Sequence, residues 1–143
     1  MDAKHVAQFV EQKVWPAHCS DGVVIELLTV DKRSETRAMI GWAGDHWHVL
    51  ADCSADPESL LFALCHELAH VVHGDMPGSR VADLSIDREI MQGAQTPSTR
   101  ARAAAWQAHD GANAARIQER RATAWAREQA ALWWGLCVST GRA

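Results

Sequence analysis

The chain has 143 residues, of which 48% are hydrophobic, and a formal net charge of −4. This length and composition allow one domain with a real core and exclude a disordered chain. The acidic balance argues against a nucleic-acid-binding surface, which needs a basic patch, and every apolar run is shorter than the roughly 18 residues of a membrane-spanning helix. We expect a single domain over residues 1–138 with a short tail over 139–143, and no direct contact with nucleic acid or membrane.

The cysteines and the N-terminal residues indicate the cellular compartment. The four cysteines are widely spaced and form no CxxC pair, which favours reduced thiols over a cysteine zinc ribbon or a disulfide framework. The first nine residues lack the apolar stretch of a secretory signal. These features predict a cytoplasmic protein.

The first third of the chain predicts one helix and three strands. Helical spacing of apolar residues over 2–15 predicts a helix that ends at Pro16. Three runs then favour strands, namely residues 23–30, 37–43 and 46–51. Short polar turns separate these runs, so we expect an antiparallel three-stranded meander within an α+β domain.

A long helix is predicted next, from residue 57 to residue 73. Asp56 is a good N-cap, Pro57 suits the first turn and Glu58 complements the helix dipole. Gly74 is a typical C-terminal stop. Beyond it we expect helices over residues 81–92 and 99–108, and a long final helix from residue 112 to about residue 137.

The predicted helix over 57–73 contains the motif His66-Glu67-Leu68-Ala69-His70. Two histidines four residues apart lie one turn apart on one helix face, so both imidazoles can reach one zinc ion. Zinc makes water a stronger nucleophile at neutral pH, and Glu67, about 100° round the helix from His66, is placed to take a proton from that water. We interpret His66 and His70 as zinc ligands and Glu67 as the general base.

A catalytic zinc site needs a third protein ligand. Glu119 is the first candidate, because Ala122 and Ala126 share its helical stripe and would let that helix approach closely. Glu89 is the fallback, since it lies 19 residues after His70 and such spacing is typical of a glutamate ligand on the next helix. His73 is on the correct face but one turn further along, where a supporting role or a core position fits better.

A peptide-cleaving site also needs a donor for the developing oxyanion, and the chain has no tyrosine. The available imidazoles are those of His46, His48, His73 and His109. His46 and His48 are two residues apart in one predicted strand, so they share one side of it and are candidates to line a cleft beside the zinc.

With these motifs in place, the sequence resembles the ImmA/IrrE metallopeptidase family. The resemblance lies in residues 61–73, which include the histidine three residues beyond HExxH, and in the later Glu119-x-x-Ala122-x-x-Trp125-Ala126. The family has phenylalanine at the position of Trp125. The resemblance covers roughly residues 23–134, and its specificity rests on the second motif because HExxH is shared by many families.

The resemblance implies a gluzincin-like, zincin-like domain in which the three-stranded sheet packs with the HExxH helix and the C-terminal helix. It implies zinc on His66, His70 and Glu119, with Glu67 as general base. Members are bacterial and phage proteins that are often linked to the cleavage of a helix-turn-helix repressor, so the resemblance implies such a transcriptional repressor as the candidate protein substrate. The gap from His70 to Glu119 is longer than the family usually shows, which predicts an insertion over residues 76–111 and keeps Glu89 as an alternative ligand.

Two other functions remain open at this point. One is a non-catalytic module of phage or mobile-element origin that binds a protein and retains zinc for structure. A closed site, with His73 or Glu89 as a fourth ligand, would favour it. The other is a metal-free helical interaction domain.

Overall fold

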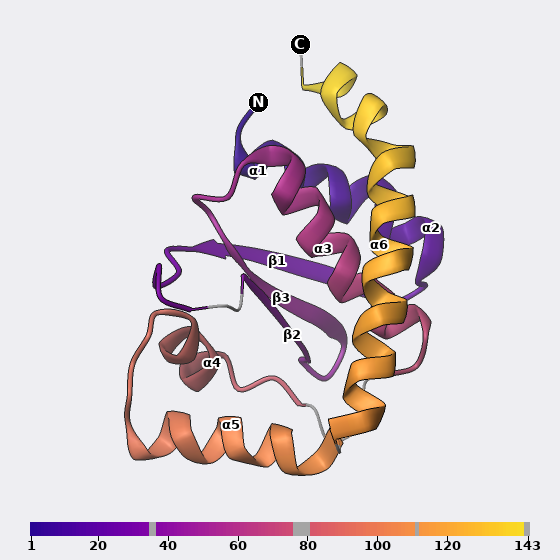
Figure 1. The fold of residues 1–143 in the computed structure, drawn as a ribbon. Coiled ribbons are helices and arrows are strands. Elements are labelled where there is room, and N and C mark those ends of the chain that lie inside the picture. The colour runs from indigo at the N-terminus through magenta and orange to yellow at the C-terminus, as the bar shows by residue number, and fades with distance from the viewer. Residues whose placement is uncertain (35–36, 76–80, 111, 142–143) are drawn as a thin grey trace.

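A computed structural model describes residues 1–34, 37–75, 81–110 and 112–141, and Figure 1 shows its ribbon. The chain folds as an α+β structure, as predicted. The elements in chain order are α1 (Ala3–Phe9), the π-helical turn η1 (Val10–Val14), α2 (Trp15–His18), β1 (Gly22–Leu28), β2 (Ala38–Trp42), β3 (His46–Asp52), α3 (Pro57–Val72), α4 (Leu84–Met91), α5 (Pro97–Asp110) and α6 (Ala112–Thr140).

The sheet is mixed, so the prediction of an antiparallel meander is wrong. The strand order is β1-β3-β2, and β1 runs parallel to β3 while β2 runs antiparallel to it. Gly44 (φ +98°) allows the tight turn between β2 and β3, which therefore form a hairpin. The link from β1 to β2 is too long to enforce a hairpin between these two strands. The strands lie on either side of β3 instead. At the end of β3, Cys53 N–H donates to Leu28 O and Asp52 N–H donates to Arg37 O.

Helices cover both faces of this sheet (Figure 1). Val49 and Ala51 of β3 belong to the main core, where they cluster with apolar residues of α1, α3 and α6. Leu50, which points to the opposite face, belongs to a smaller cluster with Met39 and with Met91 of α4. The structure therefore has α3 and α6 on one side of the sheet and α4 on the other.

The N-terminal helical segment passes Pro16 and ends at His18, so the prediction that Pro16 ends the helix is wrong. Trp15 N–H donates to Val10 O, five residues back, in a π-helical turn directly before the proline. A proline in a regular helix clashes with the carbonyl four residues back, and the wider turn relieves that approach.

The predicted helix of the HExxH motif is confirmed as α3. Asp56 caps its first turn by accepting from Ser59 N–H at 3.0 Å, and Pro57 occupies the first helical position. Gly74, at φ +70°, ends the helix. Gly74 N–H donates to Val71 O and Asp75 N–H donates to His70 O, which is a Schellman motif.

Helices α4 and α5 occupy most of the segment predicted as an insertion, of which residues 76–80 and 111 lie outside the described residues. Whether 76–111 is an insertion stays a prediction. The tail predicted over 139–143 is shorter, because α6 continues to Thr140, and residues 142–143 lie outside the description. Within the described ranges, no helix combines the length and apolarity needed to cross a bilayer.

The core around α3 predicts a large stability effect for one leucine. Leu64 is fully buried against the sheet, whereas Leu132 of α6 is 69% exposed. We expect Leu64→Ala to lower the free energy of unfolding by about 2–5 kcal/mol through lost burial and a residual cavity. The matched Leu132→Ala change should cost no more than about 0.5 kcal/mol. Urea unfolding of both variants measures the difference, and equal losses would contradict the described packing of α3.

Candidate metal centre

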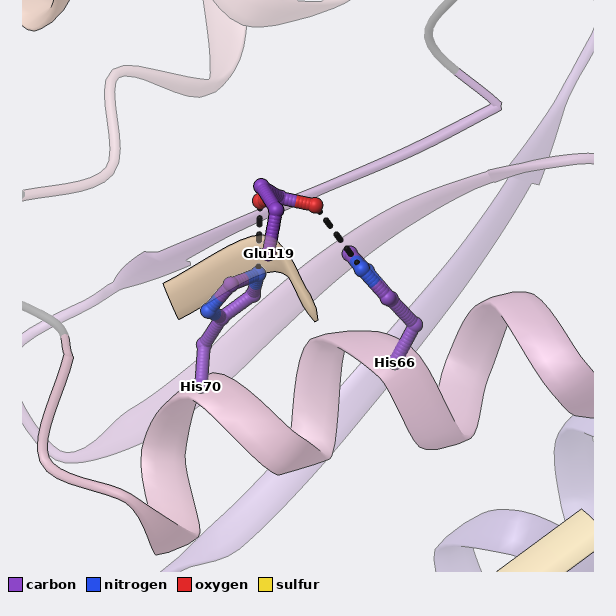
Figure 2. A group of neighbouring side chains, drawn as sticks. All are labelled: His66, His70 and Glu119. Carbon is purple, nitrogen blue, oxygen red and sulfur yellow. Dashed lines mark ion pairs between the residues drawn. The ribbon is translucent and has the colours of Figure 1, made fainter. Parts of the chain in front are cut away.

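Three side chains from two helices converge at one point (Figure 2). His66 Nε2 lies 3.0 Å from one carboxylate oxygen of Glu119, and His70 Nε2 lies 3.1 Å from the other. One ligand atom from each of the three residues lies within 4.8 Å of the other two. Among the residues that the structure describes, this is the one group of three or more histidine, cysteine or acidic side chains arranged in this way.

The two histidines owe their position to α3. They are one helical turn apart, their ring centroids are 4.9 Å apart and their planes are nearly perpendicular. Leu64 and Leu68, on the other face of the same helix, are fully buried in the core. This burial fixes the rotation of α3 about its axis, so both Nε2 atoms point away from the core and towards α6.

Glu119 owes its position to small residues on α6. Ala122 and Ala126 are fully buried, as the shared stripe predicts, and α6 runs along α3 (Figure 1). Side chains of this size let two helix backbones approach closely, which carries the carboxylate to the imidazoles. The Glu119 side chain is 57% exposed, whereas those of His66 and His70 are 19% and 10% exposed. The centre is therefore open to solvent on the side of α6.

These donors suit a zinc ion. Two imidazole nitrogens and one carboxylate form a ligand set that catalytic zinc sites use, with one further position left for water or substrate. The imidazoles bind the ion as neutral donors and the carboxylate supplies negative charge, so both kinds of ligand must be deprotonated. The residues present therefore fit the metal that the motif predicts.

Glu67 lies beside this group and is not part of it. Its side chain is 12% exposed, and one carboxylate oxygen is 4.0 Å from His66 Nδ1, which is the separation of an ion pair and too long for a hydrogen bond. The Glu67 carboxylate, with a further contribution from Glu119, holds the pKa of His66 above its ordinary value of 6.5 despite partial burial. Glu67 thus lies next to the His66 ring without belonging to the three-residue group.

The fallback ligand Glu89 and the third candidate, His73, lie elsewhere. Glu89 is exposed on α4, which covers the opposite face of the sheet from α3. His73 caps the end of α3 and packs against Trp125, with ring centroids 6.0 Å apart. Burial of His73 lowers its pKa, and its Nδ1 atom is enclosed without a hydrogen-bond partner among the described residues. Neither residue joins the group formed by His66, His70 and Glu119.

Comparison with known proteins adds no external support: no family model, no curated protein and no solved structure matches the chain. The resemblance to the ImmA/IrrE family therefore stays a hypothesis that rests on the two motifs and on the meeting of their side chains.

The interpretation of His46 and His48 as residues lining a cleft beside the zinc is not supported. The two rings lie on the same side of β3, as predicted, with centroids 5.8 Å apart. That side is the face of Leu50, which α4 covers, whereas α3 packs on the face of Val49. His48 instead contacts Glu26 at 3.2 Å. The side chain of His109 lies outside the described residues.

One functional candidate was missed from the sequence. Asp75 Oδ2 lies 3.1 Å from His70 Nδ1, and the other carboxylate oxygen accepts a hydrogen bond from Arg121 of α6. The available signal was the position of Asp75 directly after Gly74, because a Schellman motif folds the chain back onto the last turn of its helix.

The raised pKa of His66 predicts opposite effects of pH on folding and on zinc binding. Folding favours the imidazolium, so this group stabilises the metal-free fold below about pH 6.5 and loses that contribution as pH rises through the raised folded-state pKa. Zinc needs the neutral ring, so affinity should fall between about pH 8 and about pH 6. Zinc titrations at both pH values give the ratio of the affinity at the higher pH to the affinity at the lower pH. This ratio should be smaller for Glu67→Gln than for the wild type, and an unchanged ratio would contradict the effect assigned to Glu67.

Proposed function

We propose that this protein is a zinc-dependent endopeptidase of the ImmA/IrrE type that hydrolyses a peptide bond in a protein substrate. The observation that carries the proposal is the meeting of both HExxH imidazoles with the two oxygens of Glu119, at 3.0 and 3.1 Å. HExxH alone is common, but its conjunction with a glutamate from the second family-like motif is far more specific. A helix-turn-helix repressor remains the candidate substrate on the strength of the resemblance alone.

In this proposal His66, His70 and Glu119 hold the ion, and Glu67 handles protons. A zinc ion held there would polarise the scissile carbonyl and make water a stronger nucleophile at neutral pH. Glu67 takes a proton from the attacking water and returns it to the leaving amine. Its side chain is only 12% exposed, so the carboxylate lies in a less polar setting than bulk water.

The alternative is a non-catalytic protein-binding module that retains zinc for structure. A structural site is closed by four protein ligands, whereas this group has three among the side chains that the structure describes, one of them an exposed glutamate. His73 and Glu89, which were expected to close it, lie outside the group. These observations support the catalytic reading over the structural one.

Metal content and hydrolysis together test the proposal. The protein is purified without chelator or nickel resin, and its zinc is measured by mass spectrometry. We expect about one zinc per chain. A mixed peptide library, analysed by mass spectrometry, should show cleavage that a chelator abolishes and added zinc restores. Protein without zinc would favour the metal-free interaction domain, and stoichiometric zinc without hydrolysis would favour the structural module.

A further inference from the structure

The carboxylate of Asp75 lies on the far side of a proposed zinc ligand. His70 directs Nε2 towards Glu119, and its other ring nitrogen, Nδ1, is 3.1 Å from Asp75 Oδ2. The Asp75 side chain is only 4% exposed and that of His70 10% exposed. A hydrogen bond to a charged acceptor is strong where little water competes for it.

The backbone explains why Asp75 reaches this position. Gly74 adopts φ +70°, which turns the chain back at the end of α3. Asp75 N–H then donates to His70 O at 2.9 Å, so backbone and side chain of Asp75 both contact the same residue. An L-residue with a side chain at position 74 would be strained in this conformation.

A second contact holds the other oxygen of the same carboxylate. Arg121 donates to Asp75 Oδ1, and Arg121 lies two residues after Glu119 on α6. One oxygen of the Asp75 carboxylate thus contacts His70, a proposed ligand from α3. The other oxygen contacts Arg121 of α6, the helix that carries Glu119. Both oxygens are engaged, which restricts rotation of the carboxylate and therefore of the His70 ring.

We propose that Asp75 is a positioning residue of the metal centre, which accepts a hydrogen bond from His70 Nδ1–H and thereby leaves Nε2 unprotonated and aimed at the ion. This inference rests on the proposed function for its metal. Outer carboxylates of this kind fix the tautomer and raise the basicity of the ligand, and their loss typically weakens metal affinity about 10–100-fold.

The test is zinc affinity, measured by competition with a chromogenic chelator on the full chain. We expect Asp75→Ala to raise the zinc dissociation constant about 10–100-fold, and the isosteric Asp75→Asn to lower affinity in the same direction by less. Asp45→Asn is the matched control, because Asp45 also pairs with a histidine Nδ1, that of His46, outside the centre. It should bind zinc like the wild type.

The variant Arg121→Gln distinguishes the proposed positioning role of Asp75 from a purely structural role. That variant loses the contact of Asp75 with α6 but keeps the Asp75–His70 pair, so it should weaken zinc binding far less than Asp75→Ala does. Arg127→Gln, at an exposed position of the same helix, is its control. Equal losses in Arg121→Gln and Asp75→Ala, or a dissociation constant within about twofold of wild type in Asp75→Ala, would overturn the inference.

The two proposals fail differently in this experiment. Wild-type protein that binds zinc and cleaves peptides, together with unchanged affinity in Asp75→Ala, would remove the role of Asp75 and leave the proposed function intact. Wild-type protein that binds no zinc would overturn both. If Asp75→Ala fails to fold, Asp75→Asn carries the same comparison, and wild-type affinity in that variant would overturn the inference.

Discussion

Glu67→Gln is expected to lose peptide hydrolysis by about 10²–10⁴-fold while it retains one zinc per chain. Glutamine has the shape of glutamate but cannot take a proton at neutral pH. Glu67 lies outside the ligand group, so its charge is not needed to complete the ligand set. Initial rates on a cleaved library peptide, normalised to zinc content, measure the loss.

A matched control for this variant is available on the same helix. Glu58 lies in the first turn of α3 and is exposed, so Glu58→Gln makes the same chemical change away from the centre. It should cleave at close to the wild-type rate. Hydrolysis by Glu67→Gln at the wild-type rate would show that Glu67 is not the general base.

The second large effect concerns the third ligand. We expect Glu119→Ala to weaken zinc binding by more than the roughly 100-fold that marks the upper range for outer residues. Two imidazoles one turn apart would remain, and two protein ligands hold zinc far less tightly than three. Isothermal titration with zinc at neutral pH measures the change in affinity.

Glu89→Ala distinguishes the two carboxylate candidates. Glu89 is exposed on α4, across the sheet from α3, so this variant should bind zinc like the wild type. The reverse result, with tight binding in Glu119→Ala and weak binding in Glu89→Ala, would assign the third ligand to Glu89 and contradict the described packing of α6 on α3.

Local signals predicted the helix that matters most. The cap at Asp56, the proline at position 57 and the stop at Gly74 all act within a few residues, so the bounds of α3 could be derived almost to the residue. The stripe of Glu119, Ala122 and Ala126 was equally readable, because burial of small residues on one helix face follows from their spacing alone.

Non-local choices were not predictable from the same patterns. Strand spacing does not say whether β1 pairs with β2 or with β3, and the longer link between β1 and β2 leaves both arrangements open. For the same reason, the predicted position of His46 and His48 beside the zinc was not supported. Their shared side of one strand was correct, but which helix covers that side depends on how α4 returns to the sheet.

The three side chains that converge could be predicted from the sequence, whereas the residue that contacts His70 from behind could not. HExxH named His66 and His70 from helix geometry, and the second motif named Glu119. Asp75 escaped notice because its role depends on a C-terminal helix turn and on Arg121, a residue 46 positions away along the chain. Such a pair becomes visible only when α3 and α6 are placed side by side.

The most direct test of the central claim is a crystal structure of the zinc-loaded protein with anomalous data at the zinc edge. We expect one zinc with Nε2 of His66 and of His70 at about 2.0–2.1 Å, a Glu119 oxygen at about 2.0–2.2 Å and a fourth position free of protein ligands. A zinc ion without Glu119 among its ligands, or a site closed by a fourth protein ligand, would contradict it.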